Sequence, residues 1–183
     1  RPAAPSNRRR LVFSYGGQDF SVQTDAGVFS KDGLDEGSRL LLDAALPEIT
    51  GKVLDLGCGW GGVGLVVGKL KPYAQLMLSD INQRACDLAR DNLRENGVPG
   101  LVVCGDGFEA IRNRFDWILL NPPIRAGKQV VYRLFEDSSR HLLPGGRLVV
   151  VIRKEQGALS ARNHLETLYD QVALMARKKG YHV

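Results

Sequence analysis

The chain has 183 residues, the length of one domain, and its 44% hydrophobic and 25% charged content is ordinary for a globular protein. No apolar run approaches the roughly 20 residues that span a bilayer, and no signal-peptide pattern opens the chain, so we expect a cytoplasmic protein. The three cysteines, Cys58, Cys86 and Cys104, are too widely spaced for a zinc site, and we expect no metal. The net charge of +5 favours a polyanionic partner.

The amino-terminal part of the chain predicts a flexible basic arm, a β-hairpin and one helix. The arm contains Arg8–Arg10, and a Gly16-Gly17 pair joins the two hairpin strands. A mixed loop then forms a lid, and a helix with apolar side chains at helical spacing stops at Pro47. In chain order these elements cover residues 1–10 (arm), 11–15 and 18–23 (strands), 24–31 (loop) and 35–46 (helix).

From residue 52 onward, short apolar strands alternate with amphipathic helices. This alternation predicts an α/β fold with a Rossmann-like, doubly wound, mostly parallel sheet of seven strands. We expect one domain over residues 11–183, with a hairpin and lid at 11–31 and a catalytic core at 52–183. The expected strands are 53–56, 76–79, 101–104, 117–120, 147–152, 172–176 and 181–183. One expected helix follows the first strand and its glycine-rich loop and ends near residue 70, and the others cover 83–96, 130–141 and 158–169. In such sheets the ligand lies at the carboxyl ends of the strands.

A glycine-rich loop, Asp55–Gly62, follows the first core strand and opens a helix. Glycines let the backbone turn tightly and approach a ligand closely. Gly57, Gly59 and Gly62 also fit G-x-G-x-x-G, so a nicotinamide dinucleotide is one possible ligand. Asp55 gives the loop a D-x-G-x-G form, and a carboxylate here suits the cationic S-adenosylmethionine.

Two more acids end the next two strands. Asp80 is placed to accept hydrogen bonds from ribose hydroxyls, and the lesser alternative is that it caps the following helix. Asp106 is placed to accept from an adenine amino group, with Phe108 against the ring, but a turn-forming aspartate is the plain alternative. Acids at three successive strand ends favour S-adenosylmethionine more than any one of them alone.

Asn121-Pro122-Pro123 follows the fourth core strand. Prolines cannot donate N–H groups, so this rigid turn presents oxygen acceptors beside the asparagine side chain. Two such acceptors can hold both hydrogens of a planar NH2 group and favour its pyramidal form, which exposes the lone pair for methylation. The simpler alternative is that the prolines only end the strand.

The D-x-G-x-G loop together with Asn121–Lys128 resembles the class I methyltransferases, in particular the small methyltransferase domain of the 16S ribosomal RNA guanine-N2 methyltransferase C family. Thr24–Lys31, Gly33–Leu42 and Val151–Ala158 share the likeness, which extends over nearly all of residues 11–183. The resemblance implies methyl transfer from S-adenosylmethionine to guanine N2 in ribosomal RNA or the small ribosomal subunit. The expected sites are catalytic Asn121, Pro122 and Pro123; cofactor-binding Asp55, Gly57, Cys58, Gly59, Gly61, Asp80, Ile81, Asp106, Gly107 and Asn121; and substrate-binding Phe29, Ile124, Arg125 and Lys128.

Ile124 departs from the family pattern, because many N-methyltransferases carry an aromatic there that stacks on the target base. Phe29 and Tyr132 are then the alternative candidates for the stacking residue. Other functions are also open. A protein glutamine amide or adenine N6 would fit the Asn121-Pro122-Pro123 turn as the methyl acceptor. A nicotinamide-dependent oxidoreductase would leave that turn unexplained, and a catalytically silent RNA-binding module would not need Asp55 and Asp80. Two further basic pairs or runs, Arg153-Lys154 and Arg177–Lys179, are either RNA contacts or ordinary exposed charge.

Overall fold

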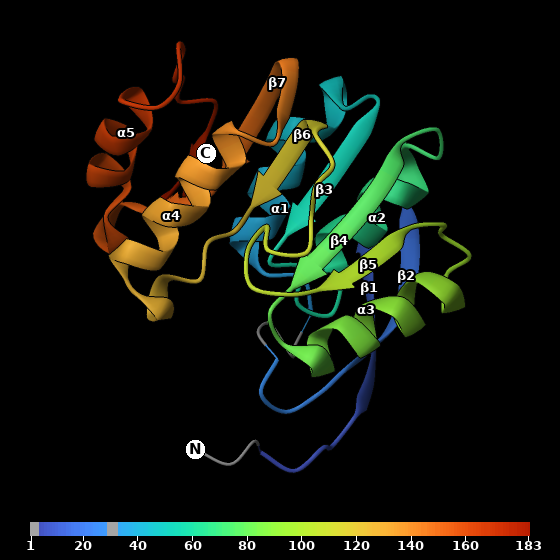
Figure 1. Cartoon of the computed structure of the whole chain (residues 1–183). Coiled ribbons are helices and arrows are strands. Elements are labelled where there is room, and N and C mark those ends of the chain that lie inside the picture. Colours follow the sequence, from blue (N-terminus) through green and yellow to red (C-terminus); the bar gives the residue numbers. More distant parts are fainter. Residues whose placement is uncertain (1–3, 29–32) are drawn as a thin grey trace.

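The computed structural model describes residues 4–28 and 33–183, and its centre is a parallel five-stranded sheet (Figure 1). The strand order is β5-β4-β3-β6-β7. The chain therefore builds outward from β3 to β5 and then crosses to the other side of β3, where ligands bind in such sheets. The strands are β3 (Lys52–Leu56), β4 (Gln75–Asp80), β5 (Leu101–Cys104), β6 (Phe115–Leu120) and β7 (Leu142–Val150).

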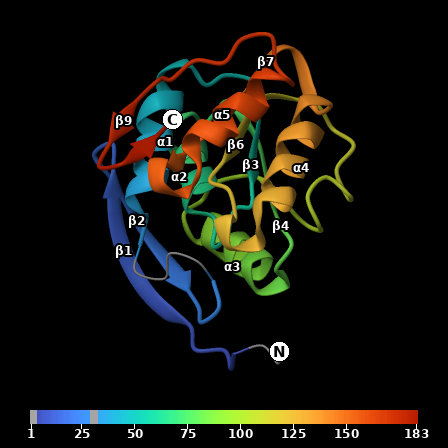
Figure 2. The same ribbon diagram turned by 90° about the vertical axis from the view of Figure 1, so that its left-hand side faces the viewer.

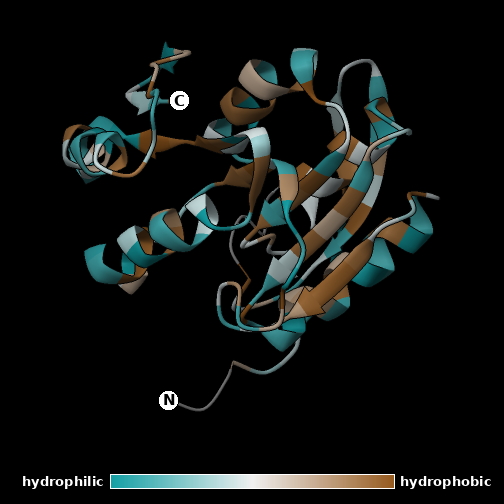
Figure 3. Cartoon of the chain, turned by 45° about the horizontal axis from the view of Figure 1, so that its top comes forward, coloured by the Kyte–Doolittle hydropathy of each residue, from teal (hydrophilic) through white to brown (hydrophobic). Residues whose placement is uncertain are grey.

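Alternate residues of each strand point to opposite faces of the sheet, which gives the sheet two hydrophobic layers. Val53 packs in the layer beneath α1, α2 and α3, whereas Leu54 packs in the layer beneath α4 and α5. Figure 2 shows α4 and α5 together on one face, and Figure 3 shows the hydrophobic strands between the helices. The helices are α1 (Glu36–Ala45), α2 (Gly62–Leu70), α3 (Gln83–Glu95), α4 (Lys128–Ser139) and α5 (Ala158–Glu166).

The predicted amino-terminal hairpin is present as β1 (Arg9–Tyr15) and β2 (Gln18–Thr24), an antiparallel pair separate from the main sheet. Both residues of the Gly16-Gly17 turn have positive φ, 58° and 75°, which matches the right-handed twist of the strands. Phe20 and Val22 are completely buried in the layer that contains α2 and α3. The hairpin thus covers the helices from outside.

The expectation of seven strands in one sheet is wrong in number, because the last strands form a small sheet of their own. β8 (Ile152–Arg153) follows β7 after the single residue Val151, and β10 (Tyr181–His182) lies antiparallel between β8 and β9 (Arg177–Lys178). Residues 172–176 are not a strand; only Met175 and Ala176 hydrogen-bond to the backbone of Val183. Their mostly exposed side chains offer little to bury against the sheet.

The segment predicted as a flexible arm is attached to the domain over much of its length. Arg9 and Arg10 already pair with β2. Before them, the Ser6 hydroxyl and the Asn7 amide donate to the Asp25 carboxylate at 2.7 and 2.6 Å. These hydrogen bonds, from Asn7 first and Ser6 second, hold the pKa of the buried Asp25 below its ordinary value.

Most other boundaries differ from expectation by a few residues. β7 begins at Leu142 because Pro144–Gly146 continue the strand through an irregularity opposite Phe115 and Trp117, rather than forming a turn before it. No helix in the described ranges is long and apolar enough to cross a membrane. Within residues 4–28 and 33–183 there are also three short 3-10 helices: η1 (Leu46–Glu48), η2 (Ile124–Ala126) and η3 (Lys154–Gln156).

Candidate active site

The loop between β3 and α2 forms a cradle of backbone. Gly57, Gly59 and Gly61 all have positive φ, at 72°, 56° and 96°, conformations that residues with a Cβ rarely adopt. The Cys58 amide donates to the Ser79 carbonyl at 2.8 Å, which ties the loop to β4. The loop is therefore fixed before any ligand arrives, with its backbone open to close approach.

Asp55 lies beneath this loop and is 5% exposed. Its Oδ2 accepts a hydrogen bond from the Gly64 amide, in the first turn of α2, at 2.9 Å. Burial, opposed by that hydrogen bond, raises the pKa of Asp55 to about 7. A carboxylate at this helix end would repel the pyrophosphate of a dinucleotide, whereas it attracts a cationic ligand.

Asp80 ends β4 with both carboxylate oxygens oriented by backbone. Oδ2 accepts from the Gly59 amide and Oδ1 from the Asn82 amide, each at 2.9 Å. The cap of α3 is Asn82, whose side chain accepts from Arg84, so Asp80 is not needed as the helix cap. Ile81 follows with 68% of its surface exposed, an apolar side chain suited to lie against an adenine ring.

The glycine loop, Asp80 and Ile81 together fit S-adenosylmethionine. The end of β5, where Asp106 was expected to bind the adenine amino group, fits the cofactor less well. Asp106 is exposed and forms an ion pair at 2.9 Å with Arg133 of α4. Gly107, at φ 54°, turns the chain after it. Phe108 is buried in the α4 layer and stacks on His141, with ring centroids 4.2 Å apart, so the expectation that Phe108 packs against the adenine is wrong.

Asn121 follows β6 at the centre of this edge, and its amide group is held from one side. Nδ2 donates to Ser38 Oγ at 3.2 Å and to Asp35 Oδ2 at 3.4 Å. A carboxylate only accepts hydrogen bonds, so the NH2 group of Asn121 must be the one that faces Asp35. The Asn121 carbonyl oxygen is consequently turned away from α1 and is available to a substrate.

Pro122 is buried and Pro123 is exposed. The Pro122 carbonyl accepts from the Ile124 amide at 2.9 Å, which closes a tight turn and engages one of its two lone pairs. The other lone pair remains for a substrate N–H. The turn thus offers two candidate acceptors for a substrate amine, the side-chain oxygen of Asn121 and the carbonyl of Pro122.

The sequence did not identify Asp35 and Ser38 as parts of this site. Asp35 is the amino-terminal cap of α1 and accepts from the Ser38 amide at 3.2 Å. An aspartate immediately before the first helical residue signals such a cap in the sequence. Its contact with Asn121 spans 86 residues of chain, which no local pattern reveals.

A cavity of about 280 Å³ lies between η2, α4, β8 and α5, beside two of the four expected substrate residues. Ile124, Lys128, Tyr132 and Ile152 are among its lining residues, and Arg125 is exposed nearby on η2. Tyr132 stacks on His164 with centroids 4.1 Å apart, and Lys128 Nζ lies 5.2 Å from its ring. These contacts cover the Tyr132 ring and disfavour it as a stacking residue, while Phe29 lies outside the described residues.

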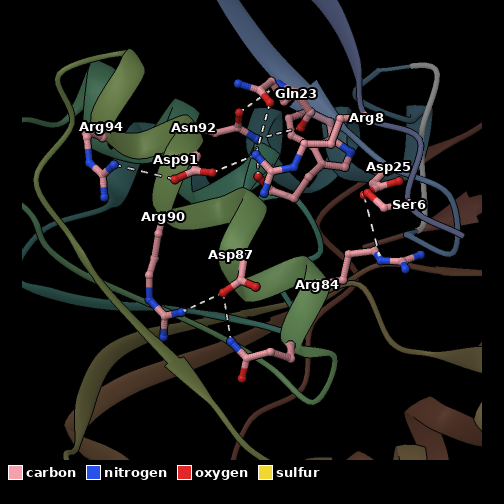
Figure 4. Close-up of polar contacts among 12 residues, drawn as sticks. Ser6, Arg8, Gln23, Asp25, Arg84, Asp87, Arg90, Asp91, Asn92 and Arg94 are labelled. Carbon is pink, nitrogen blue, oxygen red and sulfur yellow. Dashed lines mark hydrogen bonds and ion pairs between the residues drawn. The ribbon is translucent and has the colours of Figure 1, made fainter. Parts of the chain in front are cut away.

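A buried asparagine connects the cofactor loop to the hairpin (Figure 4). Asn92 of α3 is fully buried; its Nδ2 donates to the Trp60 and Gln23 carbonyls at 2.8 and 2.9 Å. Its Oδ1 accepts from the Gln23 amide at 2.8 Å. Every polar group of this side chain is used to hold β2 and the glycine loop on α3.

The three cysteines form no metal site in the part of the chain that the structure describes, where no three His, Cys, Asp or Glu residues gather suitably for an ion. Cys58 and Cys86 are buried, and Cys104 is partly buried. Burial raises the pKa of the Cys58 thiol well above its usual range, so Cys58 contributes to the cofactor loop through its backbone.

Comparison with known proteins agrees with this geometry. A family model described as the methyltransferase small domain matches residues 19–183. A Bacillus subtilis protein named YbxB is 41% identical over the whole chain, which covers 93% of that relative. Ribosomal RNA small subunit methyltransferase C of Serratia proteamaculans is 42% identical over 75% of the chain, which spans only 41% of that enzyme.

Among solved structures, a Thermus thermophilus enzyme superposes on 99% of the chain with a TM-score of 0.87 and 25% identity. It is described as a 16S rRNA N2 G1207 methyltransferase in complex with AdoMet and guanosine. The chain covers 50% of that protein, so it corresponds to one half of the longer enzyme.

Proposed function

The chain belongs to the methyltransferase small domain family, and from this premise we propose that it methylates the exocyclic N2 amine of a guanine in 16S ribosomal RNA. Its cofactor is S-adenosylmethionine. The family, the relatives named as small-subunit RNA enzymes and the cofactor-bound Thermus structure support an RNA methyltransferase. Such a substrate also entails a cytoplasmic location.

One observation carries the proposal: the side-chain amide of Asn121 is oriented by Asp35 and Ser38. The outward Asn121 carbonyl accepts one N–H of the substrate amine, and the Pro122 carbonyl accepts the other. The two acceptors draw the hydrogens to one side, so that the nitrogen lone pair is directed away from them and positive charge developing on nitrogen is stabilised.

S-adenosylmethionine, when bound, supplies a methyl group on a sulfonium sulfur; nitrogen bonds to the methyl carbon as the carbon–sulfur bond breaks, sulfur keeps the electron pair, and nitrogen then loses a proton to solvent. Asp80 and Ile81 would hold the ribose and adenine, and the ionised Asp55 would balance the positive charge. The cavity beside Ile124 would receive the base on the far side of Asn121 from Asp80. Such an arrangement would bring the two reactants together, and positioning of this kind supplies much of the acceleration in methyl transfer.

Methyl transfer from tritiated cofactor tests the proposal. Naked 16S RNA, 30S particles, tRNA and a protein extract are offered as acceptors, followed by nucleoside analysis. We expect N2-methylguanosine in 16S RNA or 30S particles. Label in adenine N6, which has the same planar NH2 group, or in glutamine of a protein would overturn the guanine assignment and support one of those acceptors instead.

Asn121→Ala tests the role of the turn. Loss of one preorganised hydrogen-bond partner at a reacting group typically reduces kcat by roughly 10²–10³, and we expect that reduction here with cofactor binding retained. Asn113→Ala, at an exposed asparagine before β6, serves as the control and should leave the rate unchanged. If Asn121→Ala retains full activity, the acceptor mechanism is incorrect.

A further inference from the structure

The two basic runs noticed in the sequence differ in how far their charge is neutralised. The amino-terminal run faces α3, whose own basic and acidic residues alternate (Figure 4). Carboxylates lie within 4 Å of five of the six arginines on this face, Arg9 being the exception among the described residues. Asp91 serves two of them, so four carboxylates oppose six cations and two positive charges remain. The ion pairs are Arg8–Asp91, Arg10–Glu95, Arg84–Asp25, Arg90–Asp87 and Arg94–Asp91.

The other run joins a second group of cations in the small carboxyl-terminal sheet. Tyr181 of β10 pairs with Arg153 on one side and Lys178 on the other, which puts the three side chains in a row on one face. The Lys154 amide donates to the Gly180 carbonyl at 2.8 Å. We call the resulting set the carboxyl-terminal basic cluster; it consists of Arg153, Lys154, Arg177, Lys178 and Lys179.

This cluster keeps most of its charge. Among the described residues, the ion pairs that reach it come from two carboxylates: Glu155 at 3.1 Å from Arg153, and Glu36 at 2.7 Å from Lys179. The hydrogen bond from Lys179, helped by Lys178 and Arg153, holds the pKa of Glu36 below its ordinary value. Five cations against two carboxylates leave three positive charges, more than half of the net +5 of the chain.

The cluster also lies next to the candidate active site. Glu36, which pairs with Lys179, directly follows Asp35, which contacts Asn121. Ile152 precedes Arg153 and lines the same cavity as Ile124. The cluster therefore borders the carboxyl edge of the sheet where the target amine would enter.

We propose that the carboxyl-terminal basic cluster binds the phosphate backbone of the RNA substrate and directs it to Asn121; the proposal rests on the proposed function above. Lysine and arginine contacts to phosphate give affinity and position without reading sequence. Exposed Arg125 and Lys128 would continue the same track along the catalytic turn. The amino-terminal arginines, by contrast, hold the hairpin against α3.

The test is the RNA affinity of charge-reversed variants. Arg177→Glu combined with Lys178→Glu changes two exposed side chains of β9. The matched control is Arg112→Glu combined with Arg114→Glu, two exposed arginines at the opposite, amino-terminal end of β6. Fluorescence anisotropy with a labelled 16S RNA fragment is recorded at several salt concentrations, with calorimetry for the cofactor and thermal unfolding for integrity.

For the cluster variant we expect the RNA Kd to rise by roughly tenfold or more near 0.1 M salt, and the slope of log K against log salt to fall by about 2. Cofactor affinity and Tm should match the wild type, and the control pair should bind RNA normally. The proposal is overturned by unchanged RNA binding in the cluster variant, by an equal loss in the control, or by wild type that binds polyglutamate more tightly than RNA. Because binding is measured without turnover, methylation at another acceptor would refute the proposed function and leave this surface standing.

Discussion

Asp35→Asn should damage catalysis more than Asp35→Ala, although it is the more conservative change. In the structure Asp35 Oδ1 accepts from the Ser38 amide, and Oδ2 faces Asn121 Nδ2. Asn at position 35 must keep its oxygen toward the Ser38 amide to cap α1, which places its NH2 group against that of Asn121. Asn121 then turns over and presents a donor, not an acceptor, to the substrate amine.

The size of the effect follows from the bonds involved. Losing a hydrogen bond to a group that becomes charged costs about 2–3 kcal/mol, which lowers kcat roughly 30- to 150-fold. The helix cap survives, so stability stays close to wild type. Asp35→Ala removes the cap, at about 1 kcal/mol or roughly 2–4 °C in Tm, but leaves Asn121 bonded to Ser38 Oγ in its original orientation. For that variant we expect a loss in kcat below about tenfold.

Single-turnover methyl transfer at saturating cofactor, with thermal unfolding of each variant, measures both rankings. From highest to lowest, Tm should follow the order wild type, Asp35→Asn, Asp35→Ala. The rate of methyl transfer should follow the order wild type, Asp35→Ala, Asp35→Asn. A residue with only a structural role cannot invert the two orders. The reasoning is refuted if Asp35→Asn stays within about threefold of wild type or exceeds the alanine variant in rate.

Two further results are expected. Burial raises the pKa of Asp55 to about 7, and a cationic cofactor binds the ionised form of this carboxyl, so cofactor affinity should increase about tenfold from pH 6 to pH 8, with proton release in calorimetry. Asp55→Asn should remove this pH-dependent gain in affinity. An identical pH profile in wild type and variant would contradict the role of Asp55. Asn92→Leu removes the three buried hydrogen bonds to the Gln23 and Trp60 backbone and should cost about 3 kcal/mol, roughly 6–12 °C in Tm. Asp91→Ala on the same helix should cost less than about 1 kcal/mol, and equal losses in the two variants would disprove the special role of Asn92.

Local patterns predicted the elements that local chemistry determines. The Gly16-Gly17 turn, the glycine loop after Asp55 and the stop of β6 before Pro122 all depend on φ preferences within a few residues. The same patterns misjudged the carboxyl-terminal strands, because pairing of Tyr181 with Arg153 depends on a contact between distant segments. Strand-like composition at residues 172–176 does not provide a partner strand.

The candidate site shows the same division. Asp80 and Asn121 lie where strand ends predicted them, at one edge of the sheet. Phe108 was misplaced because a strand-end pattern does not say which layer a following aromatic enters, and His141 with the α4 layer buries it. The partners that orient Asn121 come from α1, far away in sequence, and only the folded chain brings them together.

The strand order has a consequence for synthesis of the chain. β3 gains one neighbour, β4, within about twenty residues, but its other edge waits for β6, which begins only after the 58 residues from 57 to 114 have been added. At about 5–20 residues per second, a nascent chain carries that unpaired, apolar edge for roughly 3–12 s. Such edges pair readily with other chains. During translation the protein is therefore most exposed to aggregation at the strand that later holds the cofactor loop, and a chaperone that recognises extended apolar segments would bind there.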